Sequence, residues 1–215
     1  MKHIQKNQEP RSLTEWNQKL GGRIKDWKSF NKSVKNDVYE SLLKEQGFIC
    51  AYCSRPIIRT NCHIEHFRPK SVYKQLTFEY TNLIASCQGE DERKPRTPVH
   101  CGHKKHAWFD EELMISPLDP NCETYFKYSG SGEIIATEGV KQAAAKTTIN
   151  KLALDIDKLR RLRRTAIDAA LQISEGLEDA EIQQLIQGYQ KPDNTGRLTP
   201  FCDVIVYTLQ QYSVL

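Results

Sequence analysis

Two cysteines separated by two residues form the first pattern in this sequence that could bind a metal. Cys50 and Cys53 make a CxxC pair, and Cys62, Cys87 and Cys101 follow farther along the chain. Two thiolates at CxxC spacing can bind one soft cation from a tight turn. A redox pair instead needs the strand-to-helix turn of a larger α/β sheet, which the surrounding sequence does not predict. We therefore predict structural zinc at Cys50 and Cys53, completed by Cys87 and Cys101.

Residue types that catalyse hydrolysis crowd into the stretch HIEHFRPK that follows the CxxC pair. His66 offers an imidazole with a near-neutral pKa, which suits a general base that deprotonates water. Glu65 offers a hard oxygen for Mg²⁺ or a similar ion. A carboxylate beside a histidine, close to a metal-binding CxxC, indicates a catalytic site more than a structural one.

Two later segments carry further polar candidates. Asn82 stands directly before the apolar run LIASC that ends in Cys87. The segment CGHKK places His103 next to Lys104 and Lys105. An imidazole at His103 could bind a metal, and the two lysines could contact phosphate.

The order of these motifs, CAYC, EHFRP, NLIASC and CGHKK, resembles that of the HNH endonuclease family. Further sequence segments, which include ISPLDP and LALDIDKLRRLR, resemble those of the PtuB-like HNH nucleases of Septu and retron-linked antiphage defence systems. The core motifs cover residues 50–105, and the similarity to this branch extends over roughly 45–165.

The resemblance implies a role for each matching residue. Glu65 matches the acidic metal ligand, and His66 matches the general base. Asn82 matches the middle asparagine, which positions the loop or contacts the metal. His103 matches the final metal ligand. The implied catalytic cofactor is a divalent ion, Mg²⁺ or Mn²⁺, held by Glu65 and His103.

The same resemblance implies a zinc knuckle and a phosphate-binding set. The zinc ligands that staple the ββα-metal core are Cys50, Cys53, Cys87 and Cys101. The residues expected to bind flanking phosphates of the substrate are Arg68, Lys104 and Lys105.

The sequence departs from the family pattern near the second cysteine pair. Thirteen residues separate Cys87 from Cys101, where two are usual, and Gly102 stands between Cys101 and His103. A long loop costs little closure entropy, so the insertion is compatible with the site. Other histidines remain candidates: His100 or His106 could replace His103, and His63 could be a metal ligand or support one.

The elements that must position these residues include helices before the core. Residues 12–46 show apolar positions at helical spacing (Trp16, Leu20, Ile24 and Trp27), with an N-cap at Ser12 or Thr14. Gly21-Gly22 can split this stretch. We expect a second helix over Val34–Gln46, which Gly47 ends.

Helices are also expected after the core. An apolar stripe runs from Ala143 to Ala170, and a short acidic helix covers Glu178–Gln187. A loop over Gln190–Pro200 precedes a last buried helix over Phe201–Tyr212. The run Lys158–Arg164 holds five cations, which suit a solvated face, a nucleic-acid contact or docking on an acidic partner.

Together these patterns predict an α+β fold in which a small zinc-stapled ββα-metal (HNH) core is flanked by N- and C-terminal helices. We expect three segments: a helical segment over 1–48, the nuclease core over 49–125 and a helical region over 126–215.

Composition limits the classes of protein that fit. Hydrophobic residues make up 39% and charged residues 27% of the 215 residues, which excludes wholesale disorder. No apolar run approaches about 18 residues, and the N-terminus has no secretory pattern, so we expect a cytoplasmic protein without membrane contact. The net charge of +4 divides into +9 over residues 1–109 and −5 over 110–215. A basic half invites a polyanionic partner, although a solvated basic surface is the commoner meaning of so modest an excess.

The leading hypothesis is a metal-dependent HNH endonuclease that cleaves nucleic acid, with DNA favoured and RNA or tRNA open. The resemblance implies that it is the effector of a defence complex with a PtuA-like ABC-type ATPase, and that a retron reverse transcriptase and its reverse-transcribed DNA could take part. The alternative is a zinc-stapled nucleic-acid-binding or adaptor module without catalysis. Such a module would need the four cysteines but not Glu65 and His66.

Overall fold

The computed structural model describes residues 1–21, 26–89 and 98–212. In this part of the chain seven α-helices accompany two small β-hairpins, so the predicted α+β class is confirmed. The helices are α1 (Arg11–Leu20), α2 (Lys32–Glu45), α3 (Cys101–Lys105), α4 (Gln142–Lys151), α5 (Asp157–Ser174), α6 (Asp179–Gln190) and α7 (Cys202–Tyr212). Short 3-10 helices are η1 (Trp27–Ser29), η2 (Lys74–Leu76), η3 (Tyr80–Asn82) and η4 (Cys122–Tyr125).

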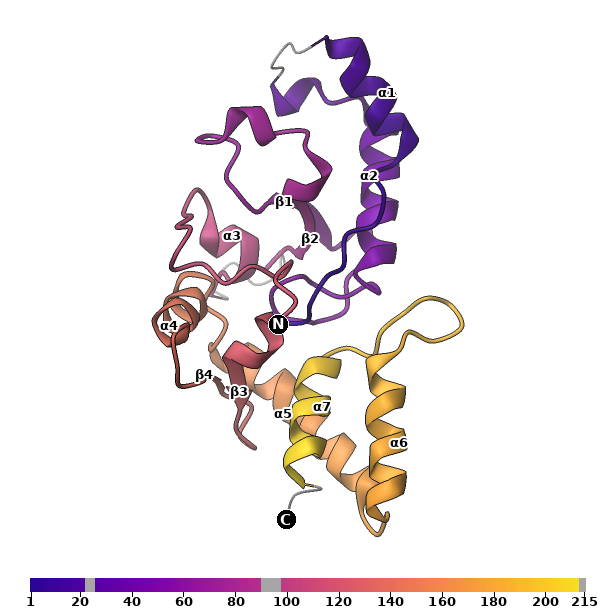
Figure 1. Ribbon diagram of the computed structural model, residues 1–215, viewed down its shortest axis with the longest axis vertical. Helices are drawn as coiled ribbons and strands as arrows, with labels where there is room; N and C mark the ends of the chain where they lie inside the picture. Colours follow the sequence, from indigo (N-terminus) through magenta and orange to yellow (C-terminus); the bar gives the residue numbers. More distant parts are fainter. Residues whose placement is uncertain (22–25, 90–97, 213–215) are drawn as a thin grey trace.

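Each hairpin is an antiparallel pair of short strands. β1 (Cys62–His66) pairs with β2 (Leu83–Cys87), and β3 (Phe126–Tyr128) pairs with β4 (Ile134–Ala136). Helices α1 and α2 lie beside the first hairpin at one end of the molecule, and α5, α6 and α7 gather at the other end (Figure 1). The first hairpin and α3 lie between these two groups and form a ββα unit.

The first helix differs from the prediction at both ends. α1 begins at Arg11, directly after Pro10, and its N-cap has no side-chain hydrogen bond, so neither Ser12 nor Thr14 caps it. Proline favours this position because its fixed φ suits the start of a helix. Gly21 adopts a left-handed φ of 57° and ends the helix, while the expected helical position Ile24 lies outside the described residues.

Helix α2 forms close to the predicted range. The Asn31 side chain accepts hydrogen bonds from the backbone N–H groups of Ser33 and Val34, which satisfies two donors at the helix start. Gly47, with a φ of 58°, follows the helix, and the predicted stop is confirmed. The buried face packs against the β1–β2 hairpin and fixes its position.

The C-terminal region contains one feature that the sequence did not predict. The β3–β4 hairpin stands where helices alone were expected, and its three-residue strands are too short to give a clear alternating pattern. The apolar stripe after Ala143 is also two helices rather than one. Residues 152–156 separate α4 from α5, and Ala153 has a positive φ of 49°.

Arg163 holds this hairpin against α5. Its side chain is 2% exposed, and it donates hydrogen bonds to the carbonyl oxygens of Gly132 and Leu154. Arg160 pairs with Asp155 on the same side. Two cations of the basic run therefore stabilise the fold, which leaves fewer of the five for a partner.

Most buried apolar residues form one cluster that runs from the first residues through both hairpins to Leu159 in α5. Two smaller clusters lie among α5, α6 and α7. Within the described ranges, no helix is both long and apolar enough to cross a membrane.

Candidate metal centre and catalytic cavity

The four cysteines predicted to bind zinc lie together at the base of the ββα unit. Their sulfur atoms lie within 4.8 Å of one another, and all four side chains are buried; this set is the one thiol-rich metal cluster in the described residues. The Sγ atoms of Cys53 and Cys87 are 3.8 Å apart. Tetrahedral zinc with Zn–S bonds of about 2.3 Å places its sulfurs roughly 3.8 Å apart, so the cluster fits a structural zinc ion.

Three separate elements supply these thiols. Cys50 and Cys53 lie on a tight turn that a bridge between Ile49 and Pro56 closes. Cys87 ends β2, and Cys101 begins α3 with a positive φ of 58°. Zinc here would therefore tie the turn, the hairpin and the helix together.

The geometry beside Cys87 explains how the cluster tolerates the long spacing before Cys101. Gly89 lies so close to His100 that a Cβ at position 89 would be 2.4 Å from the His100 carbonyl oxygen. Gly89 and His100, on either side of the inserted residues, are therefore adjacent in space. The long spacing in the sequence does not keep Cys87 and Cys101 apart.

His100, one of the alternatives for the last catalytic ligand, belongs instead to the cysteine cluster. Its ring is fully buried, and Nδ1 lies 3.0 Å from the Cys101 sulfur and 3.9 Å from the Cys87 sulfur. Hydrogen bonds from Cys101, Cys50, Cys53 and His100 lower the pKa of the Cys87 thiol, whereas burial raises the pKa values of Cys53 and Cys101.

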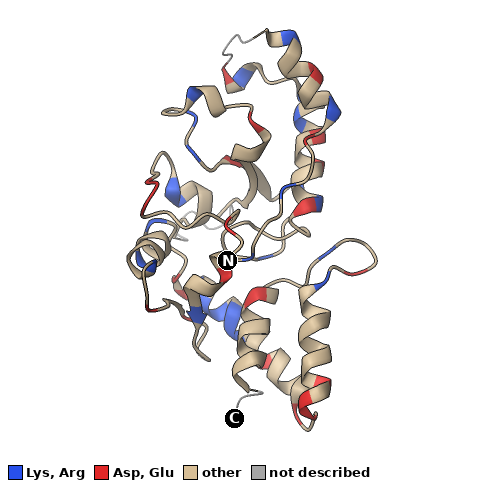
Figure 2. Ribbon diagram, viewed as in Figure 1, with Lys and Arg blue, Asp and Glu red and all other residues tan. Residues whose placement is uncertain are grey.

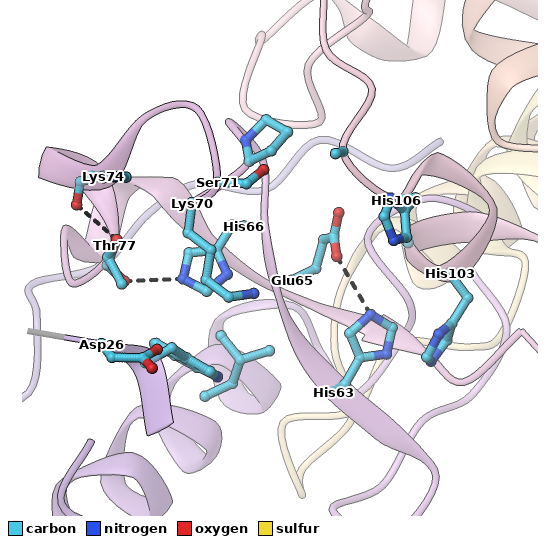
Figure 3. Close-up of a pocket in the computed structure, with 15 residues that line it drawn as sticks. Asp26, His63, Glu65, His66, Lys70, Ser71, Lys74, Thr77, His103 and His106 are labelled. Atoms are coloured by element: carbon cyan, nitrogen blue, oxygen red, sulfur yellow. Dashed lines mark hydrogen bonds and ion pairs between the residues drawn. The ribbon is translucent and has the colours of Figure 1, made fainter. Parts of the chain in front are cut away.

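A cavity of about 650 Å³ opens beside the β1–β2 hairpin and α3 (Figure 3). Its walls come from β1, from the loop that follows β1, from α3 and from the start of η1. The lining residues with polar side chains are Asp26, Trp27, His63, Glu65, His66, Lys70, Ser71, Lys74, Thr77, His103 and His106. Of the predicted catalytic residues, Glu65, His66 and His103 therefore share this cavity, whereas Asn82 does not line it.

His66 is held as a neutral base. Its Nε2 lies 3.0 Å from the carbonyl oxygen of Thr77, and a carbonyl can only accept, so Nε2 carries the proton and Nδ1 keeps its lone pair. The ring is buried and packs edge-on against Trp27 at 4.5 Å. Burial and the nearby charge of Lys70 lower the pKa of His66 to about 4, so the ring is neutral at pH 7.

Glu65 lies next to His66 and is ionised despite its burial. Desolvation opposes the charge, but hydrogen bonds from His63 and Lys105 and the charge of Lys105 outweigh it and lower the pKa of Glu65. Lys105 Nζ is 2.8 Å from Oε1 of Glu65 and 3.1 Å from the His66 carbonyl oxygen. Because Lys105 is 1% exposed, it is an internal partner of Glu65, and a phosphate at the surface does not reach it.

The second carboxylate oxygen of Glu65 pairs with His63. Oε2 lies 3.4 Å from Nε2 of His63, and both residues line the cavity (Figure 3). A Cβ at Gly102 would lie 2.7 Å from that nitrogen and 2.8 Å from that oxygen, so only glycine leaves this place open. Gly102 therefore keeps the space beside the His63–Glu65 pair accessible from the cavity.

His103 lies beside this pair. Its ring centroid is 4.4 Å from that of His63 (Figure 3), and its Nε2 is 2.8 Å from the side-chain oxygen of Gln88. His106 also lines the cavity, with a positive φ of 51° at the end of α3. The structure thus places the predicted ligand His103 in the same cavity as Glu65, beside His63.

Asn82 organises the loop that follows β1. Its amide donates to the carbonyl oxygens of Arg68 and Leu76 and accepts from the Arg68 N–H. That loop leads to Thr77, the partner of His66. Asn82 thus has the loop-positioning role, one of the two that the resemblance implied.

The other two residues predicted to bind phosphate lie elsewhere. The guanidinium of Arg68 pairs with Glu111 at 2.9 Å, and Arg68 lines a separate small cavity of about 240 Å³. Lys104 is exposed on α3 but is not among the residues that line the large cavity. The cations that do line it are Lys70 and Lys74.

Sequence reasoning missed Thr77, Trp27 and these two lysines as parts of the cavity. Lys70 follows directly after the EHFRP motif, and this position was the available signal. In the sequence Trp27 is only an apolar position at helical spacing; in the structure it is half-buried and lines the cavity. Its place next to His66 depends on how the N-terminal helices fold back over the hairpin.

A comparison with models of known protein families finds no match for this chain. A comparison with curated proteins also finds no match.

Proposed function

We propose that this protein is a metal-dependent endonuclease of the HNH type that hydrolyses phosphodiester bonds in nucleic acid. The observation that carries the proposal is the state of His66. A neutral imidazole with a defined accepting nitrogen stands in an open cavity beside an ionised carboxylate, which is the arrangement that deprotonation of an attacking water needs.

The chain's own residues divide the work as follows. His66 takes a proton from water on Nδ1, while Thr77 holds the other nitrogen and keeps the ring in place. Glu65 would hold the divalent ion, and the imidazoles of His63 and His103, which line the same cavity, are candidates for further ligands. When bound, Mg²⁺ or Mn²⁺ would neutralise charge on the scissile phosphate and on the departing oxygen. General base catalysis of this kind contributes about 10²–10⁴-fold to the rate.

The motif order carries the finer parts of the proposal. Similarity to the PtuB-like nucleases supports a role as effector of an antiphage defence complex with an ABC-type ATPase, and a retron reverse transcriptase with its DNA product as further partners. DNA is the favoured substrate, and RNA, including tRNA, is the second. The buried cluster of four cysteines, which fits a structural zinc ion, agrees with this assignment.

One observation favours the second candidate, a zinc-stapled binding or adaptor module without catalysis. The Lys105–Glu65 pair is buried and well formed, as a purely structural ion pair would be. Against it, a structural ion pair does not require the neighbouring cavity or the neutral imidazole of His66 that lines it. The two candidates differ in whether His66 is needed for bond cleavage.

The test is cleavage of plasmid DNA and of total RNA with added Mg²⁺ or Mn²⁺, compared with reactions that contain EDTA. His66→Asn is the informative variant, because its amide has no basic nitrogen and cannot act as a base. We expect the loss of cleavage with unchanged zinc content, and His3→Ala, outside the cavity, as an active control. Cleavage by His66→Asn at the wild-type rate would refute the mechanism.

A further inference from the structure

One end of the cavity is basic and lies beside an aromatic ring. Lys70 and Lys74 line this end together with Trp27. Lys35 of α2 extends over the same ring, with its Nζ 5.1 Å from a Trp27 ring centroid, and Lys70 Nζ lies 6.0 Å from it. The indole therefore holds two ammonium groups near the cavity entrance, since cations are attracted to the face of an aromatic ring.

Arg59 extends this basic patch, which we define as Lys35, Arg59, Lys70 and Lys74. Its guanidinium lies 3.6 Å from the ring centroid of Tyr39, next to α2, and donates to the side chain of Asn36. Burial and the charges of Arg59 and Lys70 lower the pKa of Lys35, which shows that these cations lie close enough to repel one another.

The basic patch lacks carboxylate partners. In the described part of the chain, no ion pair joins any of its four cations to an aspartate or glutamate, whereas Arg68, Lys105 and Arg160 all have one. Asp26 also lines this end of the cavity, and its side chain accepts a hydrogen bond from the Lys28 N–H at the start of η1. One carboxylate does not balance four cations, so the patch favours an anion from outside the chain.

The basic patch is continuous with the proposed catalytic base. Trp27 packs against His66 at 4.5 Å, and the charge of Lys70 acts on the same imidazole. The loop after β1 carries Lys70 and Lys74 (Figure 2 shows Lys and Arg along this loop) and also Thr77, which orients His66. An anion bound at the patch would therefore extend directly into the site of chemistry.

We propose that Lys35, Arg59, Lys70 and Lys74 form the binding track for the phosphate backbone of a nucleic-acid strand that runs past Trp27 to His66. This inference rests on the proposed nuclease function and names the residues that bind its substrate. The track takes over the role that the sequence assigned to Arg68 and Lys105. Ammonium groups and one guanidinium contact phosphates without reading bases, so binding is independent of sequence.

The physical consequence is a steep dependence of binding on salt. Each phosphate contact releases condensed counterions, and log K falls with log salt with a slope of about −0.7 to −0.9 for each contact. Loss of three lysines should therefore reduce the magnitude of the slope by about 2 to 3.

The experiment measures binding of fluorescently labelled single-stranded and duplex oligonucleotides by anisotropy, from about 50 to about 200 mM salt. No Mg²⁺ or Mn²⁺ is added, so that cleavage does not interfere, and EDTA is omitted so that zinc stays bound. The test variant is Lys35→Gln with Lys70→Gln and Lys74→Gln. The matched control removes three exposed lysines elsewhere, Lys141→Gln with Lys146→Gln and Lys191→Gln. Melting temperature and zinc content confirm that both are folded.

We expect the test variant to bind roughly tenfold or more weakly with the reduced slope, and the control to bind like the wild type. Whichever oligonucleotide, single-stranded or duplex, loses more affinity in the test variant is the one that the track binds. Equal affinity and slope in the test variant and the wild type would overturn the track. If the track binds nucleic acid but none is cleaved, the nuclease proposal fails and the proposed track stands. If the protein cleaves nucleic acid equally well without these three lysines, the nuclease proposal stands and the track fails.

Discussion

At the scale of single residues, the state of His66 follows from two neighbours that are distant in the sequence. Thr77 selects the protonated nitrogen, and burial with Lys70 lowers the pKa of the ring to about 4. An unperturbed histidine has a pKa near 6.5, so the environment of His66 favours the neutral ring, which is the form that can accept a proton. The same shift makes folding depend on pH.

The direction of that dependence is fixed by the lowered pKa. Between about pH 6.5 and pH 4 the unfolded chain binds a proton at His66 that the folded chain does not, so stability is full above about 6.5 and falls as the pH decreases through this window. From pH 7.5 to pH 5 the loss from this group is about 2 kcal/mol. Urea denaturation should show that the wild type loses more stability than His66→Asn over this range, and equal losses would contradict the assigned pKa.

Asn82 is the residue that shapes the loop around His66. Asn82→Asp keeps the acceptor for the Arg68 N–H but loses the donors to Arg68 and Leu76, and its charge faces two carbonyl oxygens. We expect a loss of roughly 2–3 kcal/mol and a slower cleavage rate, because the loop also holds Thr77. Urea denaturation and cleavage assays measure both, with the exposed Asn121→Asp as control. A stable, fully active Asn82→Asp would remove this role.

At the scale of elements, a zinc ion at the four cysteines would join the parts of the ββα unit. Two five-residue strands and a five-residue helix form too small a unit to fold on burial alone, and the four thiols join them at one point. The position of α3, and with it Gly102 and Lys105, then depends on the zinc site.

Removal of one zinc ligand should therefore unfold this unit. We expect about one zinc per chain in the wild type and in Cys62→Ser, and none in Cys50→Ser. Cys62 is the matched control because it is also buried, in β1, but outside the cluster. Structural zinc contributes roughly 10 kcal/mol or more in small domains, so Cys50→Ser should lose its cooperative melting transition. Elemental analysis and calorimetry measure both; Cys50→Ser that keeps zinc and stability would contradict the site.

At the scale of the whole molecule, the two ends differ in charge and in contact with the cavity. Helices α5, α6 and α7 lie away from the ββα unit, at the opposite end from α1 (Figure 1), and residues 110–215 are net negative. They are not separable from the core, because the N–H of Cys101 donates to Leu152 and that of Phe201 donates to Ser54. Surface substitutions therefore test this region better than deletion does.

We expect the ABC-type ATPase to contact these C-terminal helices. Glu175→Lys with Gln183→Lys changes two exposed positions at the end of α5 and in α6, and it should reduce co-purification with the ATPase while cleavage persists. Gln18→Lys with Glu138→Lys makes the same change of charge at exposed positions outside α5 and α6 and should have no effect. A complex that survives the first pair unchanged would argue against this surface.

The sequence alone determined the residue types and their order. The CxxC pair and the two later cysteines predicted a zinc cluster, and the structure brings these four thiols together, because ligand chemistry is readable from composition and spacing. The helical periodicity before Gly47 and after Asp157 also predicted real elements, since long amphipathic patterns are strong local signals.

Only the tertiary structure decided which of several equivalent side chains reach the cavity. Four histidines near the motifs were all possible metal ligands from the sequence: His63, His100, His103 and His106. In the structure His100 lies at the cysteine cluster, and the other three line the cavity. Lys105 and Lys70 are both cations near motifs, but one is buried on Glu65 and the other lines the basic end of the cavity. The direction in which a side chain points from a short helix or loop depends on long-range packing. Here it depends on how α1 and α2 pack over the hairpin and on how the cysteine cluster positions α3. The local sequence does not encode these contacts.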